Sequence, residues 1–320
     1  MLFRSPLSRF VWGRLFSGAL VMAGVVTAVF FIQRAVPGDP AENILGEQAS
    51  DADKEAFRER MGLNDSLGAQ YVNLWKSVGD GSLGVSYMSA DRPRKVSRIL
   101  LENLPATVEL AIAGIVVAIF VAFPLGVGAA MRPYSPLDQG SGVLALLGAA
   151  IPNFWLGPLV IFFFCVYLRW LPDPGGGMHG LQTLILPAFV LGTALSAKLM
   201  RMIRTSVLES LRAPHVLAAR SRGLGEWTLL RRHVLRNAMV PVLTLLSLQF
   251  ASLLTGAIVT EKVFGRPGLG TLLLDAVSTR DYPVVQGTVI LMAGLYTLVN
   301  SVTDIAYGWI DPRIRVGGNS

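Results

Sequence analysis

The sequence has few of the residues that stabilise small secreted domains or hold metal ions. It contains one cysteine, Cys165, so neither an internal disulfide framework nor a multi-cysteine metal site can form. Its three histidines, His179, His215 and His233, are too scattered to indicate a histidine-rich metal site. No metal and no other cofactor is therefore expected.

Common nucleotide and hydrolase signatures are also missing. No Gly-Lys dipeptide occurs, which rules out a G-x-x-x-x-G-K-[S/T] phosphate loop. Neither H-E-x-x-H nor G-x-S-x-G is present. We therefore do not expect the chain to hydrolyse ATP by phosphate-loop machinery, and the sequence carries no sign of the commonest hydrolases.

Charged residues are scarce. They make up 15% of the 320 residues, against about 25% in a typical soluble domain, while 52% of the residues are hydrophobic. This balance indicates that much of the surface meets lipid. The net charge of +7 raises the question of nucleic acid, but the positions of the basic residues argue against that partner.

Six long stretches contain no Asp, Glu, Lys or Arg. A helix needs about 20 apolar residues to cross a bilayer, where its backbone polar groups must be satisfied within the segment. The third stretch is too short for two spans, so we expect one span with a tilt or an interfacial end. The first is too long for a signal-peptide core and no A-x-A-like site follows it, which predicts a retained span. The stretches are Leu15–Gln33, Leu110–Met131, Gln139–Leu168, Pro174–Ala197, Asn237–Thr260 and Tyr282–Thr303.

The short loops predict the orientation of these spans, because Lys and Arg stay on the cytoplasmic side. The loop Lys198–Arg236, between spans four and five, carries nine basic and two acidic residues. Six spans place this loop on the same side as both termini, which are also basic, so we expect all three to be cytoplasmic. Retention of the loop and contact with anionic lipid would alone explain its charge. The terminal basic residues are Arg4, Arg9, Arg14, Arg313 and Arg315.

The basic loop also contains a helix–turn–helix pattern. Pro214 can open a helix at its first turn, and Ala218 and Ala219 favour helix. Gly223 and Gly225 fit a helix end and a turn. We therefore expect two short helices joined by a glycine turn, with small alanines that let another protein approach closely.

This pattern resembles the coupling motif of the permease subunits of ATP-binding-cassette (ABC) importers, in which such a helix docks into a groove on the ATPase. The resemblance rests on the spacing of six residues. The chain departs from the general motif at two positions, where it has Leu217 in place of Glu and Arg236 in place of Pro. Both departures are typical of the dipeptide/oligopeptide branch. The six residues of the expected coupling loop are Leu217, Ala218, Ala219, Gly223, His233 and Leu235.

Further motifs along nearly the whole chain are similar to that branch. Any one of them is weak evidence, since Pro-Gly-Asp-Pro alone is only a turn, but six in the right order are specific. They are Val36–Pro40, Gly256–Phe264, Pro267–Gly270, Arg280–Gly287, Asn300 with Asp304, and Asp311–Arg313.

The resemblance implies an all-α, six-span permease in a bacterial or archaeal cytoplasmic membrane. Its expected partners are a second homologous permease, two ATP-binding subunits, an external solute-binding protein and the lipid bilayer, with no nucleic acid. We divide the chain into a first span with an external segment (1–102), a core permease domain (103–312) and a cytoplasmic tail (313–320). The expected cargo is a peptide, the commonest cargo of this branch, or a similar small solute. Nickel chelates, glutathione, opines and some sugars are carried by close relatives.

Two regions carry more local expectations. In the external segment, Asp51–Arg60 fits an amphipathic helix with Ala52, Ala56 and Phe57 on one side, and Gly81–Gly84 fits a turn. In span three, Asn153 and Phe154 are candidates for the solute path. A helix–helix hydrogen bond explains Asn153 at least as well.

Two other functions compete with the permease reading. A secondary transporter driven by an ion gradient predicts an ionisable residue near the membrane midplane and inverted repeats. The central parts of the six stretches contain no acid or base, and no repeat is evident. An intramembrane enzyme would need a buried acid, base or metal set, and none is visible.

Overall fold

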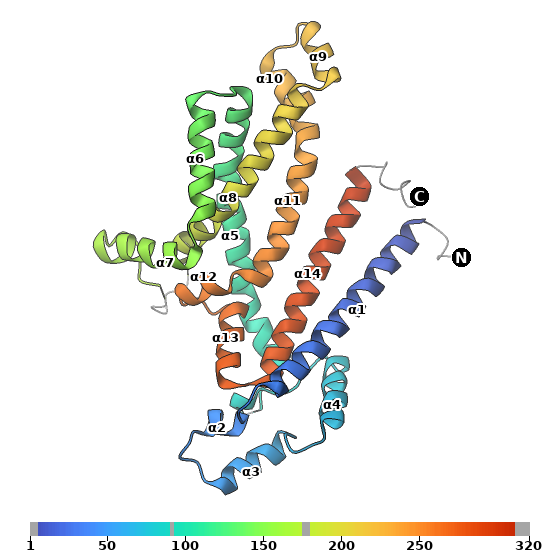
Figure 1. Ribbon diagram of the computed structural model, residues 1–320, viewed down its shortest axis with the longest axis vertical. Helices are drawn as coiled ribbons and strands as arrows, with labels where there is room; N and C mark the ends of the chain where they lie inside the picture. The colour runs from blue at the N-terminus through green and yellow to red at the C-terminus, as the bar shows by residue number, and fades with distance from the viewer. Residues whose placement is uncertain (1–5, 90–92, 175–179, 311–320) are drawn as a thin grey trace. The chain divides into compact units, whose positions relative to one another are not determined.

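The computed structural model describes residues 6–89, 93–174 and 180–310, and these form helices joined by short connections (Figure 1). The only β feature among the described residues is an isolated antiparallel bridge between Val85 and Lys95. The prediction of an all-α protein is confirmed.

By packing, the chain falls into two compact units. One combines residues 1–107 with 267–301, and the other combines 108–266 with the residues from 302 onward. The long helix α5 (Val96–Met131) belongs to the first unit up to Thr107 and to the second beyond it. The division at 102 and 312 stays a prediction.

The first unit contains the segment that the sequence predicts to be external, residues 36–102, and the helices that bracket it. Its elements are α1 (Pro6–Ala35), α2 (Pro40–Leu45), α3 (Asp51–Arg60), α4 (Leu67–Gly79), the 3₁₀ turn η1 (Tyr87–Ser89), the start of α5, α13 (Leu269–Thr279) and most of α14 (Tyr282–Ile310).

The second unit contains the basic loop and the helices on both sides of it. Its elements are the rest of α5, α6 (Pro136–Ala150), α7 (Asn153–Ile161), the π-helical η2 (Phe162–Tyr167), α8 (Leu181–Leu211), α9 (Pro214–Ser221), α10 (Glu226–Leu229), the π-helical η3 (Leu230–Val234), α11 (Leu235–Gly256) and α12 (Ile258–Val263).

Within the described residues, five helices are long and apolar enough to cross a membrane, and a bent pair makes six if it counts as one span. All six overlap the stretches expected from the sequence, although several helices extend beyond the uncharged residues. The five are Ser17–Ala35, Val96–Met131, Leu181–Leu211, Glu226–Leu254 and Tyr282–Thr303.

The third span is broken rather than tilted as a whole. Helices α6 and α7–η2 meet at an angle of 98°. Ile151 between them is extended, with ψ near 117°, and it precedes Pro152. The ring of a proline disfavours helical geometry in the residue before it, which explains a break at this point. The expected single span with a tilt or an interfacial end is therefore a bent pair of helices, either a broken span or a re-entrant segment.

Glycines allow α5 and α8 to pack closely in the second unit. A methyl group added to Gly126 would lie 2.9 Å from the Ile203 side chain and the Met200 carbonyl oxygen, and one added to Gly192 would lie 2.5 Å from Val117. Without a bulk hydrophobic force between helices in lipid, such close backbone approach is a main source of their packing energy.

In the first unit, α1 and α14 pack antiparallel. Gly18 approaches Thr297, Gly294 approaches Met22, and the Gln286 amide donates a hydrogen bond of 2.9 Å to Gln33. The C-terminal end of α1 therefore lies beside the N-terminal end of α14.

The external segment matches the sequence in its elements but not in its buried face. Helix α3 has the expected bounds and Ser50 caps it, while Gly81, Leu83 and Gly84 form the expected turn with positive φ angles. However, Ala52 and Ala56 are exposed, and the buried residues are Lys54 and Phe57. The Phe57 ring packs edge-on against Tyr87 at 6.1 Å, and this contact decides which face turns inward.

The close α5–α8 contact predicts a measurable sensitivity at Gly126. Alanine there should lower stability by about 1–3 kcal/mol, because the added methyl group meets a backbone oxygen that cannot move freely. Gly140→Ala is the matched control, since open space surrounds that helical glycine. Thermal unfolding of the purified chain in detergent should show a lower Tm for Gly126→Ala only. Equal midpoints for the two variants would contradict the packing.

Candidate functional site

The expected coupling helix forms directly after α8. The chain turns at Arg212, passes through an extended Ala213 and enters α9 with Pro214 at its first position. Val216 and Ala219 on one face of α9 are buried against Leu229 and Val234 in the core of the second unit. This packing attaches α9 to α8 and to the helix that follows.

The turn after α9 is the glycine turn expected from the sequence. Gly223 has a φ angle of 81°, a left-handed conformation that glycine adopts at little cost. Its N–H donates to the Arg220 carbonyl at 3.0 Å, and the Arg220 guanidinium pairs with Glu226 at 3.0 Å across the turn. The turn therefore has a defined shape that presents α9 to the surroundings.

The second helix differs from the expectation. It is not a separate short helix, because α10 continues through the π-helical η3 into α11 as one element from Glu226 to Leu254. His233 and Leu235 lie in this continuous helix and are half-buried. His215 of α9 is held to it by a contact of 3.1 Å with the Asn237 amide.

Only part of the expected coupling set faces outward. Leu217, Ala218 and Gly223 are exposed, whereas Ala219 packs inward. The structure adds two exposed apolar residues that the motif did not indicate, Leu224 and Trp227, the latter 70% exposed. A tryptophan inside a strongly basic loop was the available signal for this surface. We call Leu217, Ala218, Gly223, Leu224 and Trp227 the coupling surface.

A second cluster joins motifs that lie 240 residues apart in the first unit. The Arg280 guanidinium donates to the backbone carbonyls of Val36, Pro37 and Gly38. Gly38 has a φ angle of 123°, and its α-carbon faces that guanidinium so closely that a side chain would collide with it. The Pro-Gly-Asp-Pro segment is therefore more than a turn, because its backbone carbonyls bind Arg280, which lies just before the last span.

Neighbouring carboxylates extend this cluster. Asp281 is buried and accepts hydrogen bonds from the Ser86 hydroxyl at 2.5 Å and from the Met88 N–H at 3.3 Å. Asp39 caps α2 and pairs with Arg58. Desolvation alone would raise the pKa of Asp39, but the hydrogen bonds from Arg58 and the Ala41 N–H outweigh it and lower the pKa below its usual range.

The candidate path residues lie at the break in the third span. Asn153 and Phe154 form the first turn of α7, directly after Pro152. Asn153 is half-buried and the Phe154 side chain is 62% exposed. Their role in a solute path stays a prediction. The Asp304 side chain, residues 311–313 and the tail 313–320 lie outside the described residues.

Comparison with known proteins assigns the chain to a family. Residues 114–316 match the family described as the binding-protein-dependent transport system inner membrane component, and residues 7–111 match its N-terminal counterpart. The chain belongs to this permease family. Its members are multi-pass subunits of ABC importers, in which separate subunits hydrolyse ATP and a binding protein supplies the solute.

Curated peptide-transport permeases are similar to this chain over nearly its full length. The chain is 37% identical to an oligopeptide transport system permease from Bacillus subtilis (92% of this chain, 95% of the relative) and 38% identical to a di/tripeptide permease from Pseudomonas aeruginosa (91% and 94%). It is 35% identical to a probable D,D-dipeptide permease from Escherichia coli (99% of both).

Solved structures support the fold. One comes from an amino acid ABC transporter (TM-score 0.51, 15% identity, 68% of this chain and 94% of the other). The second comes from the MetNI methionine ABC transporter in inward-facing conformations (TM-score 0.52, 16% identity, 67% and 96%). The family assignment confirms the ABC permease reading over an ion-gradient-driven transporter.

The contact between Gly38 and Arg280 predicts a specific energetic coupling. Gly38→Ala should destabilise the protein through strained backbone and through collision with Arg280, at about 1–3 kcal/mol for the backbone alone. Adding Arg280→Ala should remove the collision, which gives a coupling of about 0.5–3 kcal/mol in a double-mutant cycle of thermal unfolding.

Gly46 provides the matched control for this cycle. It also has a positive φ, 84°, but no atom lies within 4 Å of an added methyl group. Gly46→Ala should therefore show the backbone cost without coupling to Arg280→Ala. Additive effects of Gly38→Ala and Arg280→Ala would contradict the contact.

Proposed function

We propose that this chain is a permease subunit of an importer for peptides or similar small solutes, and that the coupling surface docks its ATPase partner. The observation that carries the docking proposal is the exposed apolar patch at the hydrogen-bonded glycine turn. Leu217 is 50% and Trp227 is 70% exposed although both lie in a strongly basic loop. Exposed aromatic and aliphatic residues on a fixed scaffold are typical anchors of protein interfaces.

The proposed orientation places this loop and both chain termini in the cytoplasm. The loop carries the main excess of positive charge, which resists transfer across the membrane during insertion. The cytoplasm is also where ATP is available to the partner. The segment from residue 36 to 102 would then face outside, toward the solute-binding protein.

The proposed complex contains a second homologous permease, two ATPases and the external binding protein. One chain offers one coupling surface, which suits one ATPase for each permease. The peptide cargo is supported by the relatives, whose names specify oligopeptides, di- and tripeptides and D,D-dipeptides.

The packing of α9 suggests how movement passes to the membrane. Val216 and Ala219 contact the core that includes Ile203 of α8 and Val234 before α11. A displacement of α9 by the closing ATPases would therefore act on both helices together. Transport follows if the cargo and ATP favour different states of these helices.

The docking proposal predicts loss of the ATPase on removal of its anchor. Trp227→Ala should weaken retention of the ATPase by the permease, because removing a central interface anchor typically costs 2 kcal/mol or more. The measurement is copurification of the subunits in mild detergent after expression with the neighbouring genes. Trp170→Ala is the matched control, since Trp170 is also 70% exposed but lies outside the loop.

A charge test separates docking from folding. Ala218→Glu places a charge on the exposed face of α9, whereas Ala219→Glu would bury one and disturb the loop itself. Ala218→Glu should therefore abolish docking without lowering the Tm of the chain. Ala56→Glu on exposed α3 is the control and should leave docking unchanged. Full retention of the ATPase by both Trp227→Ala and Ala218→Glu would refute the assignment.

A further inference from the structure

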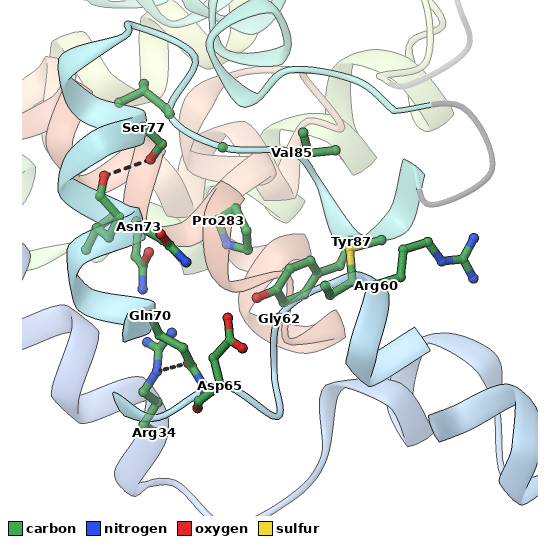
Figure 2. Close-up of a pocket in the computed structure, with 15 residues that line it drawn as sticks. Arg34, Arg60, Gly62, Asp65, Gln70, Asn73, Ser77, Val85, Tyr87 and Pro283 are labelled. Atoms are coloured by element: carbon green, nitrogen blue, oxygen red, sulfur yellow. Dashed lines mark hydrogen bonds between the residues drawn. The ribbon is translucent and has the colours of Figure 1, made fainter. Parts of the chain in front are cut away.

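The first unit contains a cavity of about 240 Å³ that none of the expected motifs explains (Figure 2). It lies among the end of α1, the end of α3, α4, the turn at residues 83–87 and the start of α14. The volume is slightly below the roughly 300–1,000 Å³ of ordinary small-molecule sites. Its occupant would therefore be small, of the size of a short dipeptide or a lipid headgroup.

Arg34 supplies a fixed positive charge to this cavity. Its guanidinium lies 3.6 Å from the centre of the Phe30 ring and donates to the Gln70 side chain at 2.8 Å and to the Phe30 carbonyl at 3.1 Å. These contacts use Nε and Nη1, and Nη2 has no hydrogen bond to a described residue. These contacts fix the position of the guanidinium and leave its Nη2 group available to donate to a ligand.

Tyr87 supplies a buried donor. Its side chain is 7% exposed, wedged between the Phe57 and Tyr282 rings, and its hydroxyl has no hydrogen bond to any described residue. Figure 2 shows the oxygen directed into the cavity. Burial raises the pKa of Tyr87 even though the nearby Arg34 charge opposes the shift, so the hydroxyl stays protonated. The hydroxyl is therefore available to donate a hydrogen bond to a ligand or water in the cavity.

Asp65, an exposed residue that also lines the cavity, supplies the opposite charge. It follows the turn at Gly62, which has a φ angle of 66°, and its Oδ2 lies 3.1 Å from the position that a Cβ atom would take on Gly62. Figure 2 shows this carboxylate facing the interior of the cavity, between Gln70 and Tyr87. No described residue forms an ion pair or a side-chain hydrogen bond with it. Apolar residues, including Leu74, Leu83 and Pro283, complete the lining.

The cavity also lies at the ends of two apolar spans. Arg34 lies in the last turn of the first span, and Gln286, another lining residue, lies in the second turn of the last span. These two helix ends are adjacent, since Gln286 bonds to Gln33. If these helices cross the bilayer over their apolar lengths, the cavity lies where the hydrocarbon ends and polar headgroups begin.

We propose that this cavity binds a small zwitterion, with Arg34 and Tyr87 holding its acidic group and Asp65 holding its ammonium group. Two molecules at this depth carry that chemistry: a short peptide with free termini, and the headgroup of phosphatidylethanolamine. The peptide source rests on the proposed function, whereas the lipid source does not.

The peptide arm uses the full chain in nanodiscs of phosphatidylglycerol with radiolabelled Ala-Ala as the probe. Saturable binding should weaken about tenfold in each variant, because Tyr87→Phe loses a hydrogen bond to the acidic group and Asp65→Asn loses the charge that attracts the ammonium group. N-acetyl-Ala-Ala-amide, which lacks both charges, should not compete. Tyr134→Phe and Asp51→Asn, at exposed positions away from the cavity, are the matched controls and should bind as the unmodified chain does.

The lipid arm uses the chain extracted from membranes that contain both phosphatidylethanolamine and phosphatidylglycerol. Native mass spectrometry should show phosphatidylethanolamine retained on the unmodified chain and lost from both cavity variants. A positive result in either arm supports the zwitterion site and identifies its source. Absence of both, or binding that is equal in the cavity variants and controls, overturns it. Failure of ATPase docking in the Trp227 experiment would leave this outcome unaffected.

Discussion

The lack of hydrogen-bonding partners inside a bilayer governs this structure. Every backbone N–H and C=O in the hydrocarbon layer must be satisfied within its own segment, which leaves helices as the form for six apolar stretches. Hydrophobic burial contributes little to packing between these helices, because an apolar side chain gains little when it leaves lipid for the surface of another helix. Close glycine contacts such as Gly126 with Ile203, and Gly18 with Thr297, therefore mark how the helices pack within each unit.

The same constraint favours the placement of charged and hydrogen-bonding side chains at the ends of the membrane-spanning helices. Arg280, Asp281 and Arg34 all lie where a span begins or ends, and each binds backbone or side-chain groups of the external segment or of the adjacent helix ends. The coupling surface lies after the end of α8, where the chain is free to leave the helix. The positions proposed for docking and for ligand binding are thus the positions where polar groups cost least.

Much of this arrangement could be predicted from uncharged run lengths and local turn chemistry. The spans, the bounds of α3, the glycine turn at Gly223 and the Pro214 start of α9 depend on neighbours in the sequence, so the sequence carries their signal. The break at Ile151 had a local cause as well, since Pro152 restricts the residue before it. The break was not predicted because the long uncharged run around Pro152 indicated a single span.

Other features depend on contacts between distant residues and carry no local signal. Phe57 turns inward because Tyr87 is there to receive it, which leaves Ala52 and Ala56 exposed. Arg280 reaches the carbonyls of Val36 to Gly38 only because α1 and α14 are antiparallel neighbours. None of these outcomes follows from spacing alone.

The central claim is that the surface of α9 contacts the ATPase. Its most direct test is cross-linking in intact membranes with a thiol-specific photoactivatable reagent, from a chain in which Cys165→Ser removes the native thiol and Ala218→Cys adds one on α9. Ala56→Cys on α3 is the control for an exposed position outside the loop. We predict that Ala218→Cys captures the ATPase subunit and that Ala56→Cys does not. Capture of the ATPase from position 56, or none from position 218, would contradict the account.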